Sequence, residues 1–207
     1  MKSISLSFEN VSFAYKKRKI LRDIDIKLSR TGISVIYGEN GAGKTTLLRL
    51  MAGFIKPESG HIIYCDNLRS SFVFQKPILL RRSVEDNLLH VLMIDNSISK
   101  FSALQKIKEI LSKYDLNHLA QEYAFNLSGG QQQMISIIRA LITKPNIIFC
   151  DEPTSNLDMK NKLIVEDLLK EKSRINKIIL ITQNEDQSNK IADEVYKLDN
   201  CKLNKIL

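Results

Sequence analysis

The chain has 207 residues and a hydrophobic content of 43%, which suits one large folded domain and excludes a disordered chain. Its formal net charge is +8, from 31 Lys and Arg against 23 Asp and Glu, which fits contact with anionic lipid, nucleic acid or nucleotides. No aromatic residues interleave with the basic ones, as a stacking platform for bases would require, so no nucleic-acid partner is expected.

The opening part of the chain alternates apolar and polar residues with the period of two that is typical of half-buried strands. Residues 3–13 are predicted to form a strand pair with Glu9-Asn10 as its turn, and residues 20–28 to form another strand. Tyr15 follows at the end of the second strand of the pair predicted at 3–13.

A glycine-rich loop lies between an apolar strand pattern at 33–37 and a helical pattern at 47–52. It matches the phosphate-loop pattern G-x-x-x-x-G-K-[ST] and consists of Gly38, Glu39, Asn40, Gly41, Ala42, Gly43, Lys44, Thr45 and Thr46. Such a loop points successive backbone N–H groups at an anion, aided by the positive end of the helix. Lys44 is predicted to reach the β- and γ-phosphates, and Thr45 to offer its hydroxyl to Mg²⁺. The alternative is a glycine turn followed by an exposed lysine.

Short strands at 61–65 and 71–74 precede a change from strand patterns to helical patterns. Ser83 has the form of a capping residue for one helix, and Ser99 for a second. The second helix is expected to pack along one face through Phe101, Leu104, Ile107, Leu111 and Tyr114.

An alternation of strands and helices resumes in the last third of the chain. The predicted helices are 132–142, 159–172 and 185–192, and the predicted strands are 147–150, 178–181, 195–198 and 201–203. In the helix at 159–172, the residues expected to face inward are Leu163, Ile164, Leu168 and Leu169. The strands at 147–150 and 178–181 are apolar throughout, as expected of buried parallel strands.

Two carboxylates follow the strand at 147–150. An acidic residue at the carboxyl end of a buried strand beside a phosphate loop is where Mg²⁺ is expected, so Asp151 is its predicted partner. Glu152 is predicted to take a proton from an attacking water as general base. A strand that ends in Asp-Glu is common, so the signal depends on its position downstream of the phosphate loop.

A second anion-binding device is predicted at Leu127-Ser128-Gly129-Gly130-Gln131. Ser128 can cap the helix that begins there, and the two glycines leave backbone N–H groups bare. One chain therefore carries two phosphate-binding devices but only one lysine-bearing loop. A Gly-Gly turn between two helices is the simpler alternative for the pentapeptide alone.

Through these motifs the whole chain resembles the ATP-binding cassette of ABC transporters, and 127–131 matches the signature motif of that family without a mismatch. The resemblance implies an α/β fold: a P-loop NTPase core with an antiparallel β subdomain and an inserted helical subdomain. The chain, 1–207, would be one such domain, with residues 1–75 and 126–207 as core and β subdomain and residues 76–125 as helical subdomain.

In that family two cassettes pack head to tail, with ATP between the phosphate loop of one and the signature motif of the other. The resemblance therefore implies that Ser128, Gly129, Gly130 and Gln131 bind ATP in trans. Tyr15 matches the aromatic residue that stacks on adenine, and Gln75 matches the glutamine that contacts Mg²⁺ and the water. Asp158, in the segment Ser155-Asn156-Leu157-Asp158, matches the loop through which the two cassettes communicate.

One position departs from the family pattern. The family usually has a histidine after the last core strand, where this chain has Gln183. A glutamine amide can donate a hydrogen bond but cannot carry charge. Gln183 is therefore predicted to take part in catalysis, with slow hydrolysis of ATP. The alternative is a cassette that binds ATP without efficient hydrolysis.

The predicted function is an ATP-hydrolysing subunit that powers a membrane transporter from the cytoplasmic face of the membrane, with ATP and Mg²⁺ as cofactors. Its expected partners are a second cassette, integral membrane permease subunits and an extracytoplasmic binding protein. Residues 72–84 resemble cassettes of tungstate- or molybdate-type importers, which favours import of a small anion. An exporter subunit, a regulatory cassette, a nucleic-acid-acting ABC ATPase and a small-molecule kinase are the alternatives.

The cysteines and the apolar runs complete the sequence-based expectations. Cys65, Cys150 and Cys201 lack pair spacing, so we expect reduced thiols rather than disulfides or a zinc site. The polar, alternating start shows no signal-peptide pattern. No apolar run reaches the ~18 residues that a membrane span needs.

Overall fold

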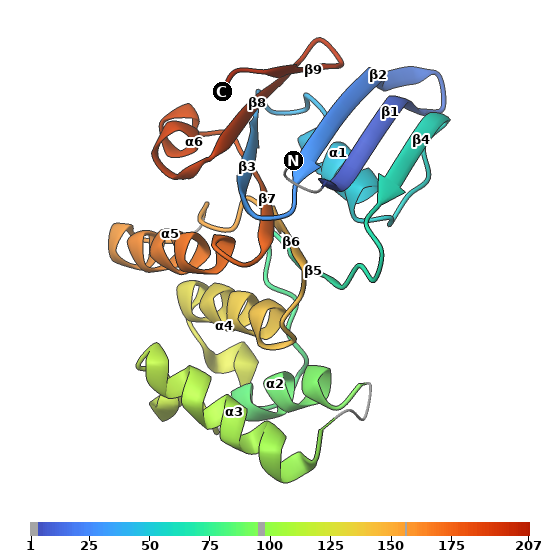
Figure 1. Cartoon of the computed structure of the whole chain (residues 1–207). Helices are drawn as coiled ribbons and strands as arrows, with labels where there is room; N and C mark the ends of the chain where they lie inside the picture. The colour runs from blue at the N-terminus through green and yellow to red at the C-terminus, as the bar shows by residue number, and fades with distance from the viewer. Residues whose placement is uncertain (1–3, 95–97, 156) are drawn as a thin grey trace. The chain divides into compact units, whose positions relative to one another are not determined.

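The computed structural model describes residues 4–94, 98–155 and 157–207, which form two compact units (Figure 1). The first unit holds the chain up to Phe72 with residues 145–152 and 163–207, and the second holds residues 73–144 and 153–162. The strands are β1 (Ile4–Tyr15), β2 (Arg18–Ser29), β3 (Gly32–Tyr37), β4 (Ser59–Tyr64), β5 (Ser70–Val73), β6 (Ile147–Asp151), β7 (Lys177–Thr182), β8 (Glu194–Asp199) and β9 (Lys202–Lys205). The helices are α1 (Lys44–Met51), α2 (Val84–Leu92), α3 (Lys100–Lys113), α4 (Gly129–Ile142), α5 (Met159–Ser173) and α6 (Glu185–Ile191), with short 3₁₀ turns at Asn117–Leu119 and Ala124–Asn126.

A six-stranded sheet in the order β5-β6-β7-β3-β8-β9 forms the centre of the first unit. Strands β6, β7, β3 and β8 pair in parallel, and β9 closes the edge antiparallel to β8. Every residue of β6 and β7 is buried, which confirms the prediction made from their uninterrupted apolar runs. Because parallel strands end at one edge, the loops after β3, β6 and β7 emerge side by side.

A second sheet, in the order β2-β1-β4, is antiparallel and also belongs to the first unit (Figure 1). The predicted turn at Glu9-Asn10 is wrong, because β1 runs unbroken from Ile4 to Tyr15. Asn10 instead has a φ of 50° at a register shift between Phe8 and Val11, and its N–H donates to Asp25 Oδ1 at 2.9 Å. The polar pair therefore makes a bulge, not a reversal.

The hydrophobic core of the first unit joins both sheets to α1. Leu47, Leu48 and Leu50 of that helix are fully buried and belong to one cluster with residues of β1, β2, β6 and β7. Leu47 and Leu48 directly follow the phosphate loop in sequence. The packing of α1 therefore fixes the end of the loop against the core.

The second unit contains the predicted helices α2, α3 and α4 (Figure 1). Ser83 and Ser99 are N-caps as predicted, since their hydroxyls accept the N–H groups of Asp86 and Ser102. The predicted inner face of α3 is correct at Ile107 and Leu111 but wrong at Phe101, which is 71% exposed. Ala103 is buried instead, so the buried stripe of α3 consists of Ala103, Ile107 and Leu111 at a spacing of four residues.

The predicted inner face of α5 also needs a correction. Leu168 and Leu169 are buried, but Leu163 and Ile164 are 42% and 37% exposed. Val165 and Glu166 take the inward positions, and Glu166 is buried because two side chains of α6 bind it. A carboxylate on the inner face was not apparent from hydrophobic periodicity alone.

Candidate functional site

The phosphate loop has the strand–loop–helix context that its motif requires, between β3 and α1. Gly41 and Gly43 have φ of 78° and 103°, a region that side-chain-bearing residues rarely adopt. A Cβ on Gly43 would lie 2.7 Å from Cγ2 of Ile20, whereas a Cβ on Gly41 would meet no atom within 4 Å. Gly43 is therefore held against β2, and Gly41 borders open space.

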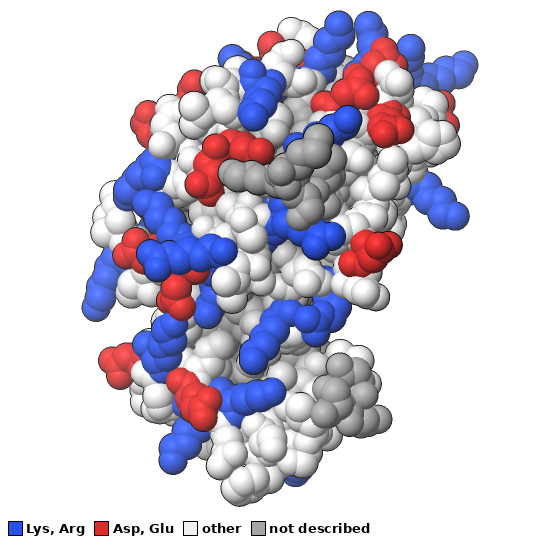
Figure 2. Space-filling view, viewed as in Figure 1, with Lys and Arg blue, Asp and Glu red and all other residues white. Residues whose placement is uncertain are grey.

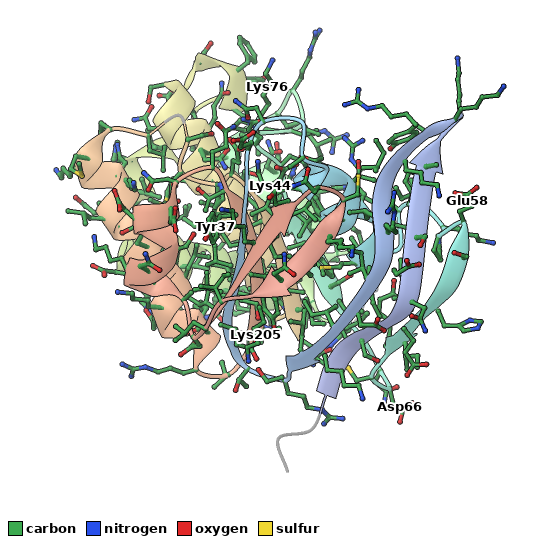
Figure 3. All side chains as sticks on the ribbon, turned by 90° about the horizontal axis from the view of Figure 1, so that it is seen from above. Tyr37, Lys44, Glu58, Asp66, Lys76 and Lys205 are labelled. Carbon is green, nitrogen blue, oxygen red and sulfur yellow. The ribbon has the colours of Figure 1, made fainter. Side chains whose placement is uncertain are left out.

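Lys44 begins α1 and folds back over the loop. Its Nζ donates to the carbonyl oxygens of Gly38 at 2.8 Å and Glu39 at 2.9 Å. Burial lowers the pKa of Lys44 below its ordinary value, although the nearby Glu152 and Asp151 act in the opposite direction. The ammonium is thus held at the centre of the loop by carbonyls that an incoming phosphate can replace (Figure 3).

Asp151, the last residue of β6, lies next to Thr45. The hydroxyl of Thr45 donates to Asp151 Oδ1 at 3.4 Å. Burial raises the pKa of Asp151, and Glu152 adds to this, while the Thr45 hydrogen bond and the charges of Arg49 and Lys44 oppose it. A hydroxyl and a carboxylate side by side are the hard oxygen ligands that suit Mg²⁺ when phosphates and water supply the rest.

Glu152 follows β6 in a strained conformation. Its φ is 45°, in the left-handed region, and its N–H donates to the carbonyl of Ile181 on β7 at 3.0 Å. The side chain accepts a hydrogen bond at Oε1 from Nε2 of Gln183, at 2.8 Å. The residue that replaces the family histidine is therefore in direct contact with the predicted general base.

The signature segment belongs to the second unit and starts α4. Ser128 is the N-cap, and it forms a reciprocal capping box with Gln131: each backbone N–H is bound by the other side chain. The space where a Cβ of Gly129 would be is open to 4 Å. The N–H groups of the first turn of a helix lack acceptors within the helix, which suits them to an anion.

The predicted site residues divide between the two units. Those in the first unit are Tyr15, the loop Gly38–Thr46, Asp151, Glu152 and Gln183, and those in the second are Gln75, Ser128, Gly129, Gly130, Gln131 and Asp158. The loop, the acidic pair and Gln183 thus lie at one edge of one sheet, while Gln75 and Asp158 stay predictions. Asn156 lies outside the described residues.

Two of the remaining predicted residues have clear local settings. Tyr15 is 47% exposed and packs edge-on against Phe13, with ring centroids 4.8 Å apart, which leaves a ring face for a partner. Asp158 accepts hydrogen bonds from the backbone and the side chain of Asn161, each at 2.8 Å, and the backbone bond holds its pKa below the ordinary value.

Residues around Gln183 were missed by the sequence-based reasoning. The hydroxyl of Tyr37, the last residue of β3, donates to Glu185 Oε1 at 3.0 Å. Thr182 donates through its own hydroxyl to Gln187 Oε1, also at 3.0 Å. Asn184, with Gln187 three positions later, is a helix-capping signal that pointed to this turn.

Neither the charged side chains nor the cysteines suggest a further site. On the face in Figure 2, Lys and Arg side chains are spread over the surface with acidic residues between them, not gathered into one stripe. Cys65, Cys150 and Cys201 are free thiols, and Cys150 is buried as predicted. Across residues 4–94, 98–155 and 157–207, no helix has the length and apolar character that a membrane crossing demands.

The chain was compared with protein families, with curated proteins and with solved structures, and all three comparisons match ABC transporter proteins. A family model described as "ABC transporter" matches residues 21–155. The lipoprotein-releasing system ATP-binding protein of Buchnera aphidicola (subspecies Schizaphis graminum) is 35% identical, over 93% of this chain and 92% of that protein. The spermidine/putrescine import ATP-binding protein of Fusobacterium nucleatum is also 35% identical, over 94% of this chain and 55% of that protein. A solved ABC transporter of metal-chelate type superposes with a TM-score of 0.84 and 30% identity, over 99% of this chain and 83% of that one, which confirms the predicted fold class.

Proposed function

Because the chain belongs to the ABC transporter family, as an ATP-binding subunit, we propose that it hydrolyses ATP and thereby drives the transport cycle of a membrane permease. The observation that carries the proposal is the contact of Gln183 with Glu152 at the sheet edge that also carries Lys44. A phosphate loop that only binds nucleotide needs the lysine, but it does not need an oriented carboxylate beside that lysine.

The proposed reaction is attack of a water on the γ-phosphate of ATP. Glu152 accepts the proton of that water, and Gln183 fixes the carboxylate that accepts it. Lys44 releases the carbonyls of Gly38 and Glu39 and binds the β- and γ-phosphates, whose charge grows on the leaving oxygens. Tyr15 offers its ring to the adenine.

We propose Mg²⁺ as the accompanying ion, held by Thr45 and Asp151; a role for Gln75 rests on the family resemblance alone. When bound, the ion neutralises charge on the β- and γ-phosphates. The neighbouring hydroxyl and carboxylate oxygens, 3.4 Å apart, support this assignment. The raised pKa of Asp151 is consistent with a carboxylate whose buried charge needs a cationic partner.

The proposed assembly is a dimer of cassettes in which the second unit of one chain completes the ATP site of the other. Ser128, Gly129, Gly130 and Gln131 supply N–H and hydroxyl donors to the γ-phosphate in trans, and Asp158 links the two sites. The capped start of α4 and the open space at Gly129 support this role. The division into core, β subdomain and helical subdomain at residues 76–125 is part of the same proposal.

The proposed partners are integral membrane permease subunits, which place the cassette at the cytoplasmic face of the membrane. A binding protein and a small oxyanion such as tungstate or molybdate rest on residues 72–84 alone. The two named relatives are described as acting in lipoprotein release and in polyamine import, and neither description favours an oxyanion. An exporter subunit is therefore the competing assignment.

A second candidate function is a regulatory cassette that binds ATP and turns it over weakly. The observation in its favour is the neutral side chain of Gln183 at a position where the family usually has a histidine. Phosphate release by the purified chain with Mg²⁺ and ATP, alone and with its permease, separates the two candidates. Turnover that is lost in Lys44→Ala supports the hydrolase; ATP binding without turnover in both settings supports the regulatory cassette.

A further inference from the structure

We infer that Gln187 and Glu166 are positioning residues, which set the direction of Gln183 toward Glu152 through a buried chain of side-chain hydrogen bonds. The inference rests on the proposed function, because it concerns the same pair of residues. It adds two residues, one on α6 and one on α5, that none of the sequence motifs includes. All of the groups involved lie in the first unit.

The chain of bonds starts at Thr182, the last residue of β7. Its hydroxyl donates to Gln187 Oε1 at 3.0 Å, and its oxygen accepts the N–H of Asn184 at 3.1 Å. That second bond closes the turn in which Gln183 is the central residue. Because Gln187 takes the hydroxyl hydrogen, the lone pairs of Thr182 are left to face Asn184.

The amide of Gln187 has its own direction fixed by α5. Its Nε2 donates to Glu166 Oε1 at 3.0 Å, and the other carboxylate oxygen of Glu166 accepts from Lys190 Nζ at 3.1 Å. Gln187 is 5% exposed and Glu166 is 2% exposed, so both bonds are shielded from water. A carboxylate at that point can only accept, which allows one orientation of the Gln187 amide.

The arrangement matters because Gln183 itself is exposed and has few restraints. Its side chain can hold Glu152 at 2.8 Å only if the backbone after β7 leaves the sheet in one direction. Glu152 is tied to the same strand, since its N–H donates to the carbonyl of Ile181. The geometry of the catalytic pair is thus a property of β7 and of the turn that Gln187 stabilises.

Three variants test the inference. Gln187→Leu removes the acceptor for Thr182 and keeps the buried volume nearly unchanged. Gln187→Glu keeps an acceptor for Thr182 but sets a carboxylate against Glu166. In the double variant Gln187→Glu with Glu166→Gln, the amide and the carboxylate exchange places, so that the bond between the two positions is restored with opposite direction and the acceptor for Thr182 is kept.

Two measurements are made on the full-length chain. The first is steady-state ATP hydrolysis, and the second is the NMR shift of the Gln183 side-chain amide, assigned by comparison with Gln183→Leu. We expect kcat to fall about tenfold in both single variants while KM for ATP is unchanged; this corresponds to roughly 1.4 kcal/mol, the size of the contribution of one hydrogen bond. The NMR signal of the Gln183 side-chain amide is expected to shift in the same two variants. The double variant is expected to restore both kcat and the position of this signal.

Asn189→Ala is the control, because Asn189 is an exposed amide on the same helix and takes no part in the bonds described above. It is expected to keep kcat within about twofold. An unmoved Gln183 signal in Gln187→Leu overturns the inference, and so does a double variant that stays as low as the single ones. If the wild-type chain hydrolyses no ATP, the proposed function fails, and the NMR signal still decides whether Gln187 positions Gln183.

Discussion

Gln183 donates a hydrogen bond from Nε2 to Oε1 of Glu152 at 2.8 Å, so the residue that replaces the family histidine is joined to the proposed general base. A neutral amide can orient a carboxylate, but it cannot exchange a proton or carry positive charge near the phosphate. Under the proposed function, this contact supports ATP hydrolysis that is slower than with a histidine at position 183.

The first prediction concerns the side chain at position 183. Gln183→His is expected to raise basal ATP hydrolysis, because an imidazole keeps the donor and adds the capacity for charge. Gln183→Leu removes the donor and is expected to lower kcat by about 10²-fold. Phosphate release under saturating ATP measures both. If Gln183→His leaves the rate of ATP hydrolysis unchanged or lowers it, glutamine is as effective as histidine or better at this position.

The second prediction concerns dimer formation. Glu152→Gln removes the base and a negative charge, so ATP is expected to stay bound and to hold two cassettes together. Light scattering after gel filtration with ATP is expected to show a dimer for this variant and a monomer in the absence of ATP. The double variant with Lys44→Ala is the control, since it loses the lysine contact to the phosphates. A monomer under all conditions would contradict the proposed trans site.

Most of the fold was predictable because local signals and burial agree in it. The apolar runs of β6 and β7, the caps at Ser83 and Ser99 and the glycine loop each specify their element over a few residues. The errors arose where tertiary contacts override a local signal. Asn10 looks like a turn residue, but Asp25 on the neighbouring strand binds it within a bulge.

The candidate site was predictable to the extent that it lies in contiguous motifs. The contact of Gln183 with Glu152 joins positions 31 residues apart, and nothing in either local sequence predicts the distance between them. Glu166 could not be predicted, because a charged residue on a helix usually faces water. The amide of Gln187 and the ammonium of Lys190, which both bind the Glu166 carboxylate, are contacts between helices that its local sequence does not predict.

A third prediction follows from the raised pKa of Asp151. A carboxyl with a raised pKa in the folded state favours folding while it is protonated, and it loses that contribution as the pH rises through the folded-state pKa. Asp151→Asn is therefore expected to raise the melting temperature at about pH 7, with a gain that shrinks as the pH falls toward about 4, the unfolded-state value. Melting curves are recorded with EDTA and without nucleotide.

The control for this measurement is Asp66→Asn, which changes an exposed carboxylate in a turn. It should show no comparable gain at either pH. The variant at Asp151 is also expected to lose Mg²⁺-dependent hydrolysis. A gain in stability that does not depend on pH would show that the buried charge is not its cause, and unchanged hydrolysis would remove Asp151 from the proposed ion site.

A fourth prediction compares two glycines of the phosphate loop. Both Gly41 and Gly43 have positive φ, so alanine at either position costs about 1–2 kcal/mol in the free energy of unfolding. Alanine at Gly43 must also displace Ile20, whose Cγ2 would be 2.7 Å from the new Cβ. Gly43→Ala is therefore expected to be the more destabilising of the two in urea titrations without nucleotide. Equal losses would mean that Ile20 moves aside without cost.

The fifth prediction separates the two roles of Ser128, helix cap and ATP ligand in trans. Ser128→Ala is expected to cost about 1 kcal/mol of unfolding free energy through loss of the cap. Ser99→Ala removes an equivalent cap from α3 in the same unit, where the hydroxyl also accepts a backbone N–H three residues later. Both variants therefore lose one serine cap of a helix in the second unit, although Ser128 also belongs to a capping box with Gln131. Only Ser128→Ala is expected to lose ATP hydrolysis and the ATP-dependent dimer of the Glu152→Gln background. A loss of hydrolysis in Ser99→Ala as large as in Ser128→Ala would assign the effect to helix stability and leave no role for Ser128 at the γ-phosphate.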